Sequence, residues 1–135
     1  MQAPKPEERV ELTLAIMHLL DRWGIAMADR IGLLALPSNN KPRNMRRYLE
    51  GEPLPDKAEV WERVGHLVGI AEALHTTYPL NQHMGILWMQ QSNRRFDNRA
   101  PITAMVEDGL AGILAVREHL DCAYAWHRDE VGQAA

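Results

Sequence analysis

The sequence predicts an all-α protein, and three observations carry this prediction. Proline, glycine and asparagine divide the 135 residues into pieces of helical length. Within these pieces, apolar residues recur at intervals of three and four, the spacing of one face of an α-helix. No piece shows the sustained apolar–polar alternation of a half-buried β-strand. We expect two regions, residues 1–78 and 79–135, that meet near Tyr78-Pro79.

Three helices are expected in the first third of the chain. The first spans residues 7–23 and ends at Gly24, because glycine readily adopts the left-handed conformation that terminates helices. The second spans residues 25–36 and stops at the breaker run 37–40 (PSNN). The third spans residues 42–50, since Pro42 suits a first turn and Gly51 closes the helix. The apolar residues predicted to share one face of the first helix are Leu12, Ile16, Leu19, Leu20 and Trp23.

A long fourth helix is expected over residues 56–76. Asp56 and Glu59 have the spacing of a capping pair at its start. Gly65 and Gly69, four residues apart, predict that another helix approaches this one closely.

Two further helices, a polar loop and a final helix follow. The helices span residues 81–91 and 101–107, and Trp88 and Phe96 are expected to pin the loop between them to the core. Pro101 fixes the second start, and Gly109 reverses the chain into the final helix. The residues predicted to share a face of the final helix are Leu110, Ile113, Leu114, Arg117, Leu120 and Tyr124.

Composition narrows the class of protein. Hydrophobic residues make up 46% and charged residues 24%, which is typical of globular domains. We expect no signal peptide and no membrane anchor, because the N-terminus is polar and the apolar runs are short. The single cysteine, Cys122, cannot form an internal disulfide, which suits a cytoplasmic protein.

A short basic segment stands out against the net charge of −3. Three helices with tight connections, followed by a longer one, fit a helix-turn-helix-like unit, in which the third helix would read DNA. Met45, Tyr48 and Leu49 would anchor that helix. The charge alone favours a solvated cationic face or a contact for an acidic partner over DNA binding, and the connection 37–41 is longer than the usual turn. The DNA-binding candidates are Lys41, Arg43, Asn44, Arg46 and Arg47.

No arrangement of residues indicates an enzyme, a cofactor site or a metal site. His119, Cys122 and His127 are the nearest approach to a metal-binding pattern, but they do not complete the four ligands of a structural zinc site. Neither Ser38 nor Ser92 lies in a nucleophile-elbow pattern, and no glycine-rich phosphate loop is present.

The run from Leu67 to Tyr124 carries a resemblance to a known family. It contains LVGIAEALHTTYP, LWMQQSNRRFDNRAP and MVEDGLAGILAVREHLD. In order and spacing these resemble the MbcA/ParS/Xre antitoxin family, most closely the Xre antitoxins paired with RES-domain toxins. Ser92 and Asn98 depart from the family's proline and small residue in the loop. The positions that match are Gly69-Ile70, Ala73-Leu74, Tyr78-Pro79, Trp88-Met89, Asn93, Phe96, Arg99, Pro101, Met105, Gly109, Val116-Arg117 and Leu120-Asp121, with Tyr48-Leu49-Glu50-Gly51 upstream.

The resemblance implies that residues 79–135 form a toxin-binding domain. The chain would be the antitoxin of a type II toxin-antitoxin system, which covers the active site of a RES-type NAD-consuming toxin and represses its own operon. Tyr124 and Trp126 would anchor in the toxin cleft while Arg117 or Arg128 pairs with carboxylates there. Trp126 folding back onto the helices is the simpler alternative. The expected toxin-binding residues are Arg117, Leu120, Asp121, Tyr124, Trp126, His127 and Arg128.

Other assignments stay open at this point. The chain could be a stand-alone helix-turn-helix transcription regulator without a toxin, or a structural helical adaptor. A homodimer is also expected, because Leu12, Leu19, Leu20 and Trp23 offer more apolar surface than a short helical unit needs.

Overall fold

The computed structural model describes the backbone of residues 4–134 and the side chains of residues 4–122. The predicted all-α class is confirmed: the described backbone contains helices, turns and one isolated bridge between Asn93 and Arg99, and no strand. No helix among the described residues is both long and apolar enough to cross a membrane. The elements are α1 (Pro6–Trp23), α2 (Met27–Leu33), the 3₁₀ helix η1 (Pro42–Tyr48), α3 (Ala58–Thr77), α4 (Gln82–Gln90), the 3₁₀ turn η2 (Arg94–Phe96), α5 (Pro101–Asp108) and α6 (Leu110–Ala134).

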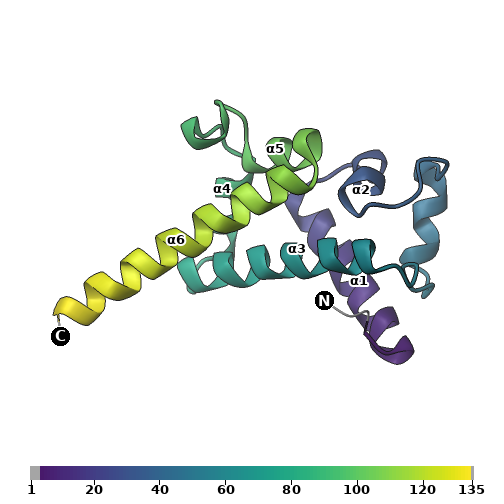
Figure 1. Ribbon diagram of the computed structural model, residues 1–135, viewed down its shortest axis with the longest axis horizontal. Coiled ribbons are helices and arrows are strands. Elements are labelled where there is room, and N and C mark those ends of the chain that lie inside the picture. Colours follow the sequence, from purple (N-terminus) through teal and green to yellow (C-terminus); the bar gives the residue numbers. More distant parts are fainter. Residues whose placement is uncertain (1–3, 135) are drawn as a thin grey trace.

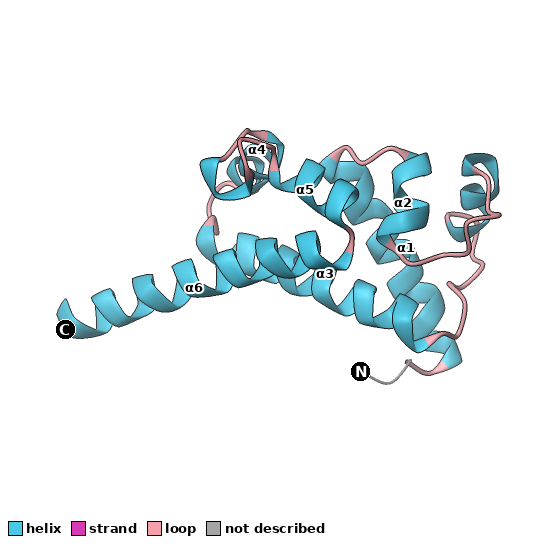
Figure 2. Ribbon diagram, turned by 45° about the horizontal axis from the view of Figure 1, so that its top comes forward, coloured by secondary structure: helices cyan, strands magenta, loops and turns pink. Residues whose placement is uncertain are grey.

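Two long helices form the frame of the molecule. α3 and α6 lie side by side and pack against each other more extensively than any other pair, and α5 packs on the start of α6 (Figures 1 and 2). α1 packs against α3 and α4, while η1 lies at the opposite end of the molecule from the C-terminal part of α6. The buried apolar side chains form one cluster drawn from both sides of residue 78. The boundary near Tyr78-Pro79 stays a prediction.

Glycines set how closely these helices approach. A Cβ on Gly69 would lie 2.7 Å from the guanidinium carbon of Arg117, so the space beside this glycine is taken by a side chain that reaches across from α6, and the predicted close approach of a helix backbone stays a prediction. A Cβ on Gly112 would lie 2.2 Å from the carbonyl oxygen of Ala104, which explains how α5 folds back tightly onto α6. Gly24 and Gly109 have φ of 78° and 65°, as their predicted roles as helix stop and chain reversal require.

The apolar face of α1 is used inside the chain. Leu19, Leu20 and Trp23 are buried in the common core, and Leu12 packs against its edge. These four residues therefore leave no spare apolar face, which removes the reason given above for a homodimer. The homodimer itself remains a prediction.

A buried arginine joins α1 to α2. Arg30 is 3% exposed, and its guanidinium donates to the carbonyl oxygens of Ile25 and Met17 and pairs with Asp21. These partners satisfy a charge that would otherwise be costly to bury. Nothing in the spacing of the sequence indicated this contact.

Several predicted details were wrong. α3 begins at Ala58 without a side-chain cap, because Lys57 occupies the N-cap position and its side chain has no acceptor; Asp56, one residue earlier, pairs with Arg9 at 3.5 Å. The second helix ends at Leu33, since Ala35 adopts a φ of 57° that interrupts it. Leu114 is 41% exposed; the face of α6 that enters the core carries Ile113, Val116 and Leu120.

Candidate functional site

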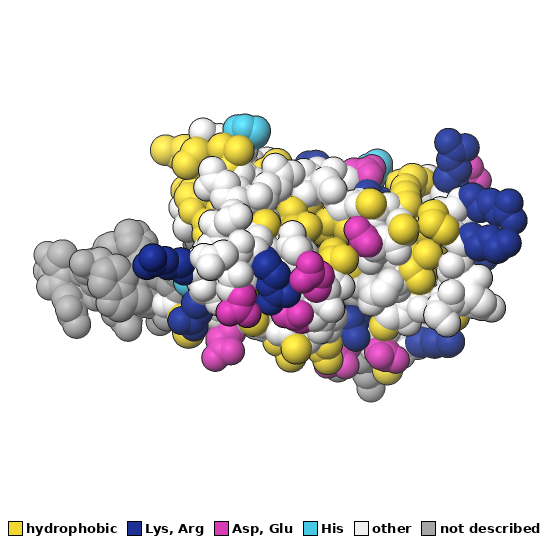
Figure 3. Space-filling view, turned by 90° about the horizontal axis from the view of Figure 1, so that it is seen from above, with side chains coloured by type: hydrophobic (Ala, Val, Ile, Leu, Met, Phe, Trp, Pro, Cys, Tyr) yellow, Lys and Arg dark blue, Asp and Glu magenta, His cyan; other side chains and the backbone are white. Residues whose placement is uncertain are grey.

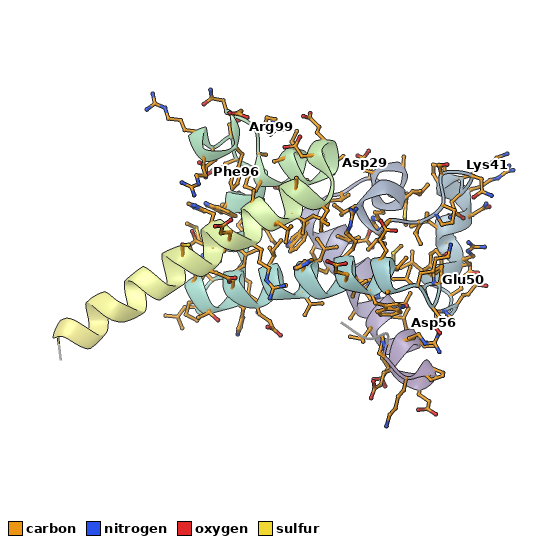
Figure 4. All side chains as sticks on the ribbon, in the orientation of Figure 1. Asp29, Lys41, Glu50, Asp56, Phe96 and Arg99 are labelled. Carbon is orange, nitrogen blue, oxygen red and sulfur yellow. The ribbon has the colours of Figure 1, made fainter. Side chains whose placement is uncertain are left out.

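The predicted DNA-binding residues gather on one exposed surface at the η1 end of the molecule. We call Lys41, Arg43, Asn44, Arg46 and Arg47 the basic surface, and all five are exposed. Figure 3 shows Lys and Arg side chains gathered at this end, and Figure 4 places Lys41 at its tip. The structure thus brings these five residues together.

The segment that carries them is a 3₁₀ helix, where the sequence predicted an α-helix over residues 42–50. Its end is closed by short-range bonds in which the amides of Leu49 and Glu50 donate to the carbonyls of Arg46 and Arg47. Such i→i+3 bonds satisfy the terminal backbone groups of this segment before the chain turns at Gly51.

The 3₁₀ geometry sorts the side chains into rows. With about three residues per turn, side chains three apart lie almost in line. Met45 and Tyr48 form the row that is buried, at 0% and 1% exposure. Arg43 and Arg46 form a row on the exposed side. The predicted anchoring by Met45 and Tyr48 is confirmed, and Leu49 is partly buried against the core.

Arg47 differs from the other cations of the basic surface. Its guanidinium pairs with Glu52 at 2.9 Å, donates to Asn40 at 3.1 Å and to the Tyr48 hydroxyl at 3.0 Å, and lies over the Tyr48 ring. Among the described residues, Lys41, Arg43 and Arg46 form no ion pair. These three cations are therefore the ones presented to an external anion, while Arg47 braces the segment.

The predicted toxin-binding residues that the structure describes lie on α6. The Arg117 guanidinium donates to His66 Nδ1 on α3 at 2.8 Å and is 3.8 Å from the Asp121 carboxylate. The side chains of Arg117 and Asp121 are 37% and 60% exposed. Leu120 is 4% exposed and belongs to the core, so it supports the helix and presents no side chain to a partner.

The remaining predicted toxin-binding residues lie further along the same helix. The backbone of α6 continues as a helix to Ala134 and extends beyond the other helices in Figure 1. The side chains of Tyr124, Trp126, His127 and Arg128 lie outside the described residues.

An aromatic cluster joins α4, η2 and α6. The rings of Trp88 and His119 are stacked with centroids 5.8 Å apart, and the Phe96 ring meets both edge-on at 6.3 and 5.9 Å. The predicted pinning of the loop by Trp88 and Phe96 is therefore confirmed. Burial, together with the nearby charge of Arg95, lowers the pKa of His119. Sequence reasoning missed His119 here, because no spacing relates it to Trp88 or Phe96.

Arg99 joins the loop to α5. Its guanidinium donates to the carbonyl of Phe96 at 3.0 Å, to Asp108 at 2.8 and 3.1 Å, and to Glu107 at 3.1 Å. The hydrogen bonds that Arg99 donates lower the pKa of Asp108, and by donating to both Asp108 and Glu107 the guanidinium has its own pKa raised. The arginine and proline of the quoted motif thus act together, since Pro101 begins the helix whose last turn supplies both acids.

Chemical sites are sparse in the described part of the chain. No three His, Cys, Asp or Glu side chains within it are placed to hold a metal ion. A cavity of about 190 Å³ lies where α1, α3 and α4 meet, and its apolar wall is broken only by Arg22, His75 and Gln82. This cavity brings no nucleophile and base together.

Comparison with protein families found no family model that matches the chain, and comparison with characterised proteins found no match.

Proposed function

We propose that this chain is the antitoxin of a type II toxin-antitoxin system and neutralises a RES-type toxin that consumes NAD. The observation that carries the proposal is that the residues of the motif LWMQQSNRRFDNRAP contact one another in the structure. Trp88 and Phe96 are in ring contact, and Arg99 bonds to the carbonyl of Phe96. Arg99 also pairs with the last turn of the helix that Pro101 begins. The residues of this one stretch therefore form a contacting unit, which supports treating them together as the motif that carries the resemblance.

In the proposed mechanism the C-terminal part of α6 blocks the toxin's active-site cleft. The core contacts of Ile113, Val116 and Leu120 fix the helix, so that its continuation is directed away from the body of the molecule. Tyr124 and Trp126 then enter the cleft and exclude NAD, because large aromatic side chains contribute most to binding at interfaces. Arg117 is already engaged by His66, and we therefore assign the pairing with cleft carboxylates to Arg128. The inhibition is stoichiometric and involves no chemistry on this chain.

The basic surface serves repression of the operon in this proposal. Lys41, Arg43 and Arg46 contact operator phosphates, and a dimeric toxin-antitoxin complex doubles those contacts. A 3₁₀ segment of seven residues is a poor substitute for a recognition helix in the major groove, so base reading is weak and backbone contact dominates.

The test is co-expression with the product of the adjacent gene. Full-length chain should restore growth and block NAD loss in cells that express that product. A chain truncated after Leu120 should keep its helical circular dichroism but fail to protect, as should the double variant Tyr124→Ala/Trp126→Ala. Lys57 is exposed and lies outside both the basic surface and the C-terminal part of α6, so Lys57→Ala is the matched control and should protect fully. Full protection by the truncated chain would show that the tail is not the inhibitory element.

A second candidate, a stand-alone transcription regulator without a toxin, is favoured by the exposed basic surface alone. It predicts tight, salt-sensitive binding of promoter DNA by the purified chain and no protein partner. A structural helical adaptor predicts neither activity. The neighbouring reading frame distinguishes the candidates most cheaply, because a RES-like gene beside this one is expected only for the antitoxin.

A further inference from the structure

The loop between α4 and α5 displays two arginines whose charge is not used by the fold. Arg94 and Arg95 are exposed, and among the described residues neither guanidinium has a hydrogen-bond or ion-pair partner. The third arginine of the loop behaves differently. Arg99 lies within 4 Å of three carboxylates, those of Asp97, Glu107 and Asp108. The three acids therefore all pair with Arg99, and Arg94 and Arg95 are left exposed to solvent.

The loop is also built more rigidly than a surface connection needs to be. The side chain of Asn93 accepts from the amide of Arg95 at 2.9 Å, and the backbone of Asn93 bonds to Asn98 and Arg99 at 3.0 and 3.1 Å. Phe96, between the two exposed arginines and the turn, is 5% exposed and inserted against Trp88 and His119. The backbone that carries Arg94 and Arg95 is therefore fixed on both sides.

This rigidity is obtained with strained backbone. Asp97 and Asn98 are consecutive residues in the left-handed region, with φ of 57° and 62°. Asp and Asn tolerate this conformation better than most residues, yet it remains unfavourable and is concentrated at functional positions.

The charge balance indicates what kind of partner fits. Arg94, Arg95 and Arg99 are offset by Asp97, Glu107 and Asp108, so the region carries no net charge. A nucleic acid is attracted by an excess of cations over a wide surface, as at η1. Exposed guanidinium groups on a fixed backbone within a neutral surrounding instead suit individual carboxylates, which they bind through two parallel hydrogen bonds.

We propose that Arg94 and Arg95 form a docking point for carboxylates on a protein partner, next to α6. The two arginines lie near α6, because the ring of the adjacent Phe96 contacts His119 of α6 and the charge of Arg95 acts on His119. This inference rests on the proposed function, because the partner we assign is the toxin that the end of α6 blocks. The loop fixes the orientation of the toxin while the helix fills its cleft.

The experiment measures binding of the adjacent gene product, immobilised, to full-length variants. Arg94→Ala/Arg95→Ala should weaken binding about 30-fold or more, mainly through faster dissociation. Arg94→Lys/Arg95→Lys should give an intermediate loss, since lysine keeps the charge but not the paired hydrogen bonds. Arg22→Ala/Lys57→Ala removes two exposed charges elsewhere and should change the affinity less than threefold. Unchanged thermal unfolding and Trp fluorescence would show that the aromatic cluster is intact.

The outcomes separate this inference from the function on which it rests. Tight binding by the wild type and equal binding by the Arg94→Ala/Arg95→Ala chain would overturn the docking point and leave the antitoxin intact. A loss of operator affinity without a loss of toxin affinity would also overturn it, in favour of a phosphate contact. No binding by the wild type would overturn the antitoxin proposal and the docking point together.

Discussion

The basic surface on η1 and the loop that carries Arg94 and Arg95 both present arginines on short segments, but the acids around the arginines differ. Each is a short irregular segment that presents arginines and is fixed by a buried aromatic ring, Tyr48 in one and Phe96 in the other. They lie toward opposite ends of the molecule, as Lys41 and Phe96 show in Figure 4. The difference lies in the acids around them. Glu52 pairs with only one cation of the basic surface, whereas three acids balance the loop.

The number of arginines on a surface does not by itself indicate which partner binds there. An uncompensated row of cations suits a polyanion, whose counterions are released on binding. A region whose other charges are balanced, and which leaves two guanidinium groups exposed on a fixed backbone, suits a surface with matching carboxylates. One chain can therefore carry a nucleic-acid contact and a protein contact at once, at separate places.

The largest expected effect comes from removing the anchor of each segment. Phe96→Ala should lower the free energy of unfolding by about 3–5 kcal/mol, and Met45→Ala by about 2–5 kcal/mol, because each leaves a cavity in place of a buried side chain. Chemical denaturation measures the loss. In hydrogen exchange, the backbone amides of residues 92–98 should exchange faster only in Phe96→Ala, and those of residues 42–49 only in Met45→Ala. Simultaneous release of both segments by either variant would show that they are one cooperative unit.

A smaller effect concerns the salt dependence of DNA binding. Replacing Lys41, Arg43 and Arg46 by alanine together should reduce the slope of log K against log salt concentration by about 0.9 for each charge that contacts a phosphate. Arg47→Ala should reduce it less, since Arg47 is held by Glu52. The Arg94→Ala/Arg95→Ala chain should keep the wild-type slope. If the Arg94→Ala/Arg95→Ala chain showed an equal reduction in slope, the loop would also contact DNA and the proposed difference between the two regions would be wrong. Titration of operator DNA at several salt concentrations measures the slope.

The smallest expected effect is a pH dependence of stability that arises from His119, the residue of α6 that contacts Trp88 and Phe96. Burial and the charge of Arg95 lower the pKa of His119, so the unfolded chain takes up a proton before the folded chain does. The contribution of neutral His119 to stability is therefore present above its unfolded pKa of about 6.5 and is lost as the pH falls toward the lower folded pKa. The contribution of His119 is measured by comparing the denaturation midpoints of the wild type and of His119→Gln between pH 8 and pH 5. A wild type that gains stability relative to His119→Gln on acidification would contradict the prediction.

Much of the fold was predictable because it depends on local chemistry. Pro42 and Pro101 begin their helices as expected, and Gly24 and Gly109 end or reverse theirs. The burial of Met45, Tyr48 and Phe96 also followed from their positions between polar neighbours. The exposed cations of η1 were identified for the same reason. Each of these features depends on a few adjacent residues.

The sequence by itself determined where the helices lie and which short segments present charge, because proline, glycine and the periodicity of apolar residues act within a turn or two. Only the tertiary structure decided that η1 is a 3₁₀ helix, that Asp56 pairs with Arg9, and that His119 stacks on Trp88. It also decided which arginines are neutralised and which are left exposed. These outcomes depend on the packing of distant helices, which brings together side chains that no spacing relates.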